Sequence, residues 1–165
     1  MKGLSVAALS VGLTLGAAPH AAAQTSAGAA EKAAVSAAVQ ALFDAMAARD
    51  AQKALALVVP EGQLQSVRKT EAPAVARSRS LEAFANSLPT QKSPMLERMW
   101  NPDVHVAGPI ASLVTRYDFH LDGTFTHCGT DIFTLVKTAD GWKISGGIYT
   151  VESTGCEPSP LGEPK

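Results

Sequence analysis

Apolar residues recur every three or four positions in the first part of the chain. These positions are Val35, Ala38, Val39, Leu42, Phe43 and Met46. A stripe of this kind predicts one long helix over residues 31–49. A second, shorter helix can begin at an N-cap, Asp50, and must end before Pro60.

Weaker signals follow between residues 60 and 90. Residues 63–70 alternate between polar and apolar side chains, which predicts a first strand. Ser80 is a good N-cap, Glu82 suits a first helical turn, and Pro89 ends the segment. We therefore expect a third helix from Ser80 to about residue 88.

From residue 95 the pattern is that of strands separated by turn signals. The expected strands span residues 95–101, 104–107, 110–121, 125–136 and 142–151. Asn101-Pro102, Gly108-Pro109, Asp122-Gly123 and Ala139-Asp140-Gly141 separate them. Helices first and an antiparallel sheet afterwards predict an α+β fold.

The N-terminus has the three parts of a signal peptide. These are Lys2, an apolar run over residues 4–15, and Ala21-Ala22-Ala23 before Gln24. The apolar run is too short to span a bilayer, although an uncleaved anchor is the alternative. Cleavage after Ala23 predicts a periplasmic or secreted protein that has no membrane segment.

The rest of the chain is long enough for one domain. We expect the order signal peptide, short linker, domain and disordered tail over residues 1–23, 24–30, 31–156 and 157–165. Fourteen Lys and Arg residues oppose fifteen Asp and Glu residues, without a basic run. Binding of nucleic acid needs clustered cations, so nucleic acid is not an expected partner.

Cys128 and Cys156 are an even count in a chain expected to reach an oxidising compartment. A disulfide between them is therefore the simplest prediction. The alternative to a disulfide is that a cysteine binds a metal or acts as a catalytic nucleophile. No C-x-x-C motif is present and the histidine spacing matches no known site, so we expect neither a metal nor a cofactor.

The dipeptide Asp122-Gly123 predicts a two-residue hairpin turn and with it a strand register. Leu121 would face Thr124, and Asp118 would face His127. Directly opposed residues share one face of a sheet. One face is thus predicted to carry Arg116, Asp118, His127 and Asp131, and the other Tyr117, Cys128 and Thr130.

The last hairpin, around residues 138–141, predicts which face is covered. It groups Asp131 with Phe133, Leu135, Trp142, Ile144 and Ile148. The larger apolar face should pack on the helices, so Asp131 and its companions are expected to point inward. A single bulge would reverse this assignment beyond it.

The second half of the chain resembles the secreted bacterial branch of the NTF2-like (SnoaL-like) superfamily. The resemblance lies in L-E-R-M-W-N-P-D-V-H-V from Leu96, R-Y-D-F-H-L-D-G, H-C-G-T-D-I-F-T-L-V-K, D-G-W-K-I and the final Cys156. It covers about residues 31–156 and implies a cone of curved antiparallel sheet wrapped on N-terminal helices. This scaffold hosts isomerases, dehydratases, cyclases and binding domains, so it indicates a fold and not a reaction.

Inward charges in an apolar cavity suit acid–base chemistry, because burial raises the pKa of a carboxyl group. The candidate catalytic residues are Asp131, Asp118 and His127. The candidate ligand-binding residues are Arg116, Val114, Phe133, Trp142 and Ile148. Members of the superfamily that resemble ketosteroid isomerase use a cavity aspartate as proton shuttle, so the resemblance implies this role for an inward aspartate. This chain does not show the full set of that enzyme's residues, and Tyr117 is expected to face away.

Alternatively, Arg116 pairs with Asp131 or Asp118 and only neutralises a buried charge. Three functions therefore stay open. The first is an exported domain that holds a small apolar molecule in its cavity, and the second an isomerase or dehydratase. The third is an interaction module that forms a homodimer through the open face of its sheet. A carboxylate without a cationic partner inside the cavity would separate them.

Overall fold

The computed structural model describes residues 19–68 and 74–164, with side chains from residue 26 onward. Most of the expected signal peptide, residues 1–23, lies outside this part of the chain. Within the described residues, no helix is long and apolar enough to cross a membrane.

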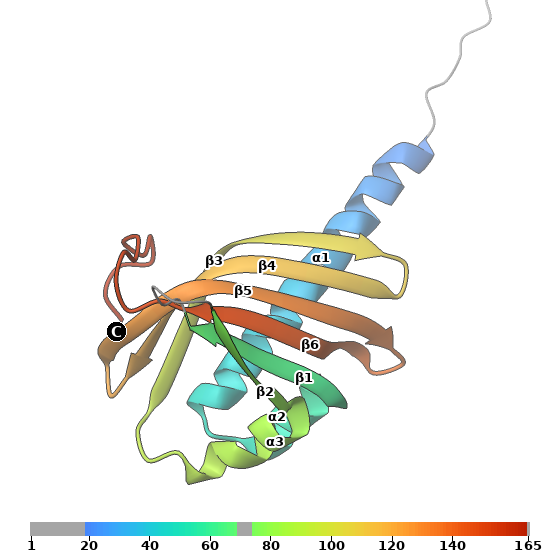
Figure 1. Ribbon diagram of the computed structural model, residues 1–165. Helices are drawn as coiled ribbons and strands as arrows, with labels where there is room; N and C mark the ends of the chain where they lie inside the picture. The colour runs from blue at the N-terminus through green and yellow to red at the C-terminus, as the bar shows by residue number, and fades with distance from the viewer. Residues whose placement is uncertain (1–18, 69–73, 165) are drawn as a thin grey trace, which may run out of the picture.

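The described residues form three α-helices, one short 3₁₀ helix and a six-stranded sheet (Figure 1). The elements in chain order are α1 (Pro19–Ala47), α2 (Ala51–Leu57), β1 (Val58–Arg68), β2 (Val75–Ser80), α3 (Leu81–Ser87), η1 (Leu88–Thr90), β3 (Met95–Ala107), β4 (Ile110–Leu121), β5 (Thr124–Thr138) and β6 (Gly141–Val151). The sheet curves around α1, and α2 and α3 lie at the side of β1 and β2. The α+β prediction is confirmed.

The strand order is β2-β1-β6-β5-β4-β3. Neighbouring strands are antiparallel except β1 and β6, which run parallel. The sheet is therefore mixed, and the expectation of a wholly antiparallel sheet is wrong at this one pairing. A parallel neighbour needs a long connection, and here the chain between the two strands passes through β2, α3 and the β3–β5 meander.

Both predicted N-caps are confirmed. The Asp50 side chain accepts a hydrogen bond from the backbone N–H of Lys53 at 3.0 Å and caps α2. Ser80 Oγ accepts one from the backbone N–H of Ala83 at 3.0 Å and caps α3. Both caps satisfy helix N–H groups that have no partner inside the helix.

The structure differs from the expected element bounds in four places. β1 begins at Val58 and not at residue 63, and the expected end of this strand, residues 69–70, lies outside the described residues. Residues 24–30, expected as a linker, are helical and belong to α1. The two strands expected at residues 95–101 and 104–107 form one strand, β3, with a bulge between Trp100 and Asp103. The edge strand β2 had no apolar alternation to predict it, because its residues are exposed.

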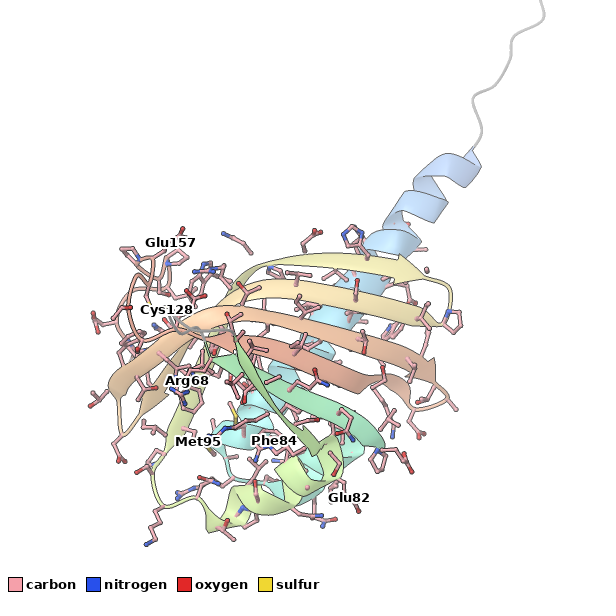
Figure 2. All side chains as sticks on the ribbon, viewed as in Figure 1. Arg68, Glu82, Phe84, Met95, Cys128 and Glu157 are labelled. Atoms are coloured by element: carbon pink, nitrogen blue, oxygen red, sulfur yellow. A yellow bond between two sulfur atoms is a disulfide. The ribbon has the colours of Figure 1, made fainter. Side chains whose placement is uncertain are left out.

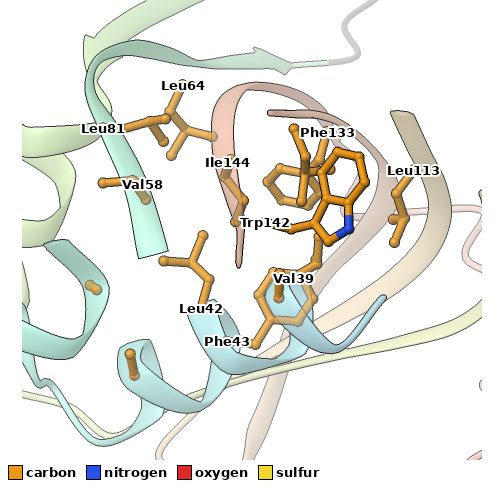
Figure 3. Packing of buried hydrophobic residues seen from close by; sticks show 14 of the residues in the cluster. Val39, Leu42, Phe43, Val58, Leu64, Leu81, Leu113, Phe133, Trp142 and Ile144 are labelled. Carbon is orange, nitrogen blue, oxygen red and sulfur yellow. The ribbon is translucent and has the colours of Figure 1, made fainter. Parts of the chain in front are cut away.

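The core lies between the concave face of the sheet and the helices (Figure 3). Trp142 is 7% exposed, and its Nε1 donates a hydrogen bond to Glu31 Oε2 at 3.0 Å. Phe43 of α1 meets Phe133 of β5 edge to face, with ring centroids 6.0 Å apart. The expectation that Trp142 closes the sheet against the first helix is confirmed.

A disulfide joins Cys128 to Cys156, as predicted, with 5.9 Å between their Cα atoms. Cys128 pairs with Glu152 in an isolated bridge. Beyond the disulfide, residues 157–164 form no helix or strand, but the Gly162 carbonyl accepts a hydrogen bond from Arg98 Nη1 at 2.9 Å. The described part of the tail, expected to be disordered, thus contacts the outer face of the sheet.

Candidate functional site

A bulge in the β4–β5 hairpin decides which side chains of β4 face inward. The turn is as predicted, with Leu121 opposite Thr124, but the register shifts by one residue between Phe119 and His120. Beyond the shift, Phe119 lies opposite His127, and an extra residue on one strand exchanges the two faces of its neighbour. The predicted pairing of Asp118 with His127 is therefore wrong.

The first bulge moves three candidates out of the interior and brings Tyr117 into it. Asp118 lies opposite Cys128, Arg116 opposite Thr130 and Val114 opposite Ile132, all on the outer face. Tyr117, which was expected to face away, lies opposite Gly129 on the inner face and is buried.

A second bulge has the same effect on β6. The register shifts between Thr134 and Leu135, so that Asp131 lies opposite Tyr149 and not Ile148. Ile148 is 38% exposed on the outer face, which corrects its place among the ligand-binding candidates. Asp131 keeps its predicted inward position, because β5 itself has no extra residue between Asp131 and the turn to Trp142.

The inner face, α1 and α3 enclose a cavity of about 170 Å³. Its wall is mostly apolar and includes Phe84 of α3 and Met95 of β3, both labelled in Figure 2. The ionisable side chains in the wall are Arg79, Glu97, Tyr117, His127, Asp131 and Tyr149. Of the predicted site residues, the cavity includes Asp131, His127 and Phe133.

The central polar feature of the cavity is a pair of carboxyl groups. Glu97 of β3 and Asp131 of β5 share a hydrogen bond between their side chains. Asp131 is 1% exposed, and its Oδ2 atom has no hydrogen-bond partner. Sequence reasoning missed Glu97, because the β3–β4 register could not be derived without knowing the bulge in β3.

Burial raises the pKa of Asp131 to about 7. The pKa of Glu97 is raised well above its usual range, first by burial and then by the negative charge of Asp131. Near neutral pH, Glu97 is thus the protonated partner that donates a hydrogen bond to Asp131. The pair can accept one more hydrogen bond at Asp131 Oδ2 and can exchange a proton.

Two other ionisable groups of the cavity, Tyr117 and His127, already have partners. The Tyr117 hydroxyl donates a hydrogen bond to the Thr150 carbonyl at 2.7 Å, and burial raises the pKa of Tyr117 well above its usual value. The His127 ring stacks on Phe119 with centroids 4.9 Å apart. Burial lowers the pKa of His127, so its ring is neutral at pH 7.

On the outer face, Arg98 and Asp118 are paired with each other. Arg98 binds Asp118 through two hydrogen bonds, at 2.9 Å from Nε and 2.6 Å from Nη2. Burial alone would raise the pKa of Asp118, but Arg98 outweighs burial and lowers it. Arg116 Nη1 donates to Thr130 Oγ1 at 3.1 Å, so the alternative in which Arg116 neutralises Asp131 is wrong.

Metal binding finds no support in the arrangement of side chains. Over the described ranges, no group of three His, Cys, Asp or Glu residues is placed to hold a metal ion. Both cysteines are in the disulfide, which leaves no thiol for nucleophilic catalysis in this state.

Residues 30–150 match the model of a family described as putative lumazine-binding. No curated protein matches the chain in sequence. Several solved structures share the fold. An NTF2-like protein with a cystatin-like fold from Novosphingobium aromaticivorans has a TM-score of 0.65 at 14% identity, covering 84% of this chain and 92% of that one.

Two further structures share the fold, with slightly lower TM-scores. An NTF2-like superfamily protein from Salmonella enterica serovar Typhimurium has a TM-score of 0.60 at 16% identity, covering 84% of this chain and 99% of that one. A putative dehydratase of the NTF2-like family from Streptomyces avermitilis has a TM-score of 0.58 at 16% identity, covering 75% and 97%. The fold is thus that of the NTF2-like superfamily.

Proposed function

The chain belongs to the family described as putative lumazine-binding, and from this premise we propose that it binds a small, flat, largely apolar molecule in its cavity. The observation that carries the proposal is the Glu97–Asp131 pair. A buried carboxylate oxygen without a hydrogen-bond partner is costly, and a ligand with an N–H or O–H group would satisfy it.

The size of the cavity limits the ligand. Pockets for drug-sized molecules enclose roughly 300–1,000 Å³, whereas an engineered cavity of about 150 Å³ binds benzene. The volume of about 170 Å³ therefore suits one or two fused rings. Aromatic walls from Phe84, Phe119 and Phe133 favour a flat molecule.

Lumazine is a flat two-ring compound with ring N–H donors, more polar than the cavity wall, and it is the first ligand to test because the family is described as putative lumazine-binding. Isothermal titration calorimetry should detect binding to the wild-type protein, with a loss of about tenfold in affinity for Asp131→Asn. Arg116→Gln is the matched control, because Arg116 lies on the outer face. Equal affinity of all three proteins for lumazine and for 2-naphthol would contradict the proposal.

A second candidate is proton-transfer catalysis of the isomerase or dehydratase type. The pKa of about 7 makes Asp131 an acceptor of protons at neutral pH, and the protonated Glu97 next to it is a donor. The test is exchange of the acidic C–H protons of 2-indanone in heavy water, followed by NMR. Catalysis requires faster exchange with wild type than with Asp131→Asn, and equal rates would exclude it for this substrate.

Export to the periplasm or the cell exterior is also part of the proposal. The disulfide is typical of oxidising compartments. From residue 26 onward, where side chains are described, the first buried residue of α1 is Val35, well after Ala23. Mass spectrometry of the exported protein should find Gln24 at its N-terminus, and a chain that keeps its first 23 residues would contradict this.

We further propose a homodimer through the outer face of the sheet. Ile110, Ile132 and Ile148 are 56%, 42% and 38% exposed on adjacent strands, and Ile132 lies directly opposite Ile148. Exposed apolar patches of this kind support association. Light scattering should give a dimer mass that Ile132→Asp reduces to the monomer, and a wild-type monomer would refute the proposal.

A further inference from the structure

We propose that the ligand of the cavity carries a carboxylate, which Arg79 binds at the rim while the donor end of the ligand reaches Asp131. This inference rests on the proposed function and extends it, because it names the chemical class of the ligand: a small aromatic or cyclic acid with an N–H or O–H group at its far end.

Arg79 is placed at the rim by two adjacent elements. It is the last residue of β2 before Ser80, the N-cap of α3, and it lies opposite Leu64 of β1. Its guanidinium carbon is 4.6 Å from the ring centre of Phe84. Stacking on an aromatic face holds a guanidinium in one plane and leaves its edge N–H groups available to a planar anion.

Among the residues that the structure describes, the Arg79 guanidinium has no acidic partner. Among the described residues, its single side-chain hydrogen bond is a long one, 3.5 Å from Nη1 to Ser87 Oγ. No carboxylate in residues 26–68 or 74–164 lies within ion-pair distance of Arg79. By contrast, Arg98 has Asp118, so the fold does provide partners for arginines elsewhere.

Tyr149 of β6 lies opposite Asp131 of β5 in the sheet, and both line the same cavity as Arg79. Burial raises the pKa of Tyr149, the positive charge of Arg79 lowers it, and the negative charges of Glu97 and Asp131 raise it. Tyr149 is therefore within electrostatic range of both ends. A ligand along the Tyr149 ring can meet a cation at the rim and an acceptor at the inner end.

Charge complementarity favours this orientation over the reverse. A carboxylate placed next to Asp131 would meet a like charge in a buried site, which is strongly unfavourable. At the rim the same group can form a two-pronged pair with the guanidinium, the strongest arrangement for these partners. A neutral ligand would gain nothing from Arg79 beyond its contact with Phe84.

The test uses two ring compounds that differ only in the anion. Both 2-naphthol and 6-hydroxy-2-naphthoate carry an O–H donor, and the second has a carboxylate at the opposite end. Calorimetry at pH 7.5 should show the naphthoate binding about tenfold tighter to the wild-type protein. Arg79→Gln should bring the affinities for the two compounds to about the same value, so the ratio of the two affinities within each protein is the readout.

Arg77→Gln is the matched control, since Arg77 lies on the same exposed strand but not in the cavity wall. It should keep the preference for the naphthoate. Equal affinities in the wild-type protein, or a preference that survives Arg79→Gln, would overturn the inference. If Arg79→Gln and Arg77→Gln lose the preference equally, the inference is also overturned, because the preference would then depend on the total positive charge of β2 and not on the position of Arg79.

The proposed function fails in a different way. If Asp131→Asn leaves the affinity for 2-naphthol unchanged, the acid pair is not the inner anchor, even where Arg79 still selects the naphthoate. If neither compound binds the wild-type protein, both the cavity-binding function and the carboxylate inference are overturned.

Discussion

Replacing Asp131 with Asn should stabilise the folded protein above neutral pH, although most substitutions of buried residues destabilise. The side chain is 1% exposed, and its pKa of about 7 exceeds the usual value of about 4 by roughly three units. One unit corresponds to 1.36 kcal/mol, so ionisation of Asp131 costs the fold about 4 kcal/mol. Asparagine occupies the same space and cannot ionise.

The pH window follows from the direction of the shift. Between about pH 4 and pH 7, the native protein holds a proton on Asp131 that the unfolded chain has lost, so its free energy of unfolding falls as the pH rises. Below this window the site contributes no cost. Above it the full cost is present, and Glu97, whose pKa burial also raises, adds to the decline in the same direction.

Urea unfolding at 25 °C, followed by the fluorescence of the buried Trp100 and Trp142, measures the effect. The stability of Asp131→Asn minus that of wild type should rise by about 4 kcal/mol between pH 4 and pH 8. A difference that does not vary with pH would refute the reasoning, since it would mean that Asp131 has an ordinary pKa.

Asp118→Asn is the control of opposite sign. Arg98 lowers the pKa of Asp118 against the effect of burial, so this ion pair stabilises the fold above about pH 4 and is lost as the pH falls. Removing one partner of a buried pair costs about 3 kcal/mol at neutral pH. The two aspartates thus test the two faces of one sheet.

Three other substitutions test the packing. Cys156→Ala should lower the free energy of unfolding by about 3–4 kcal/mol, because the disulfide closes a loop with a sequence separation of 28 residues; equal stability with and without reductant would contradict this. Trp142→Ala should cost about 3–5 kcal/mol in urea unfolding, and a loss below about 1 kcal/mol would mean that the ring adds little to the core. Gly129→Ala should cost about 1–3 kcal/mol, since its new Cβ would clash with the Thr150 carbonyl and the Tyr117 ring; an unchanged near-ultraviolet circular dichroism spectrum would show that Tyr117 has not moved.

Signals that act over a few residues were enough to predict most elements. The caps Asp50 and Ser80, the turn Asp122-Gly123 and the two cysteines each specify a local geometry that the structure reproduces. These features depend on the backbone conformation of neighbouring residues or on a simple count. The sequence therefore predicted the helices, the hairpins and the disulfide.

The faces of the strands were harder to predict, because each depends on the register of the whole hairpin. The extra residue Thr126 in β5 exchanges the faces of β4, and Ser145 does the same for the second half of β6. Nothing in the sequence near Thr126 marks that bulge. Beside Ser145, the pair Gly146-Gly147 was a usable signal, since glycine within a strand often accompanies a bulge.

On the outer face of the sheet, Asp118 has a partner of opposite charge, but two acids face each other on the inner face. Glu97 and Arg98 are neighbours on β3, yet Arg98 binds Asp118 on the outer face while Glu97 meets Asp131 in the cavity. A lysine or arginine facing inward from the same strand could have neutralised Asp131 in the same way. Natural sequences keep an energetically unfavourable group, such as a buried acid without a cationic partner, mainly at functional sites. Asp131 is therefore the best argument that the cavity binds a ligand.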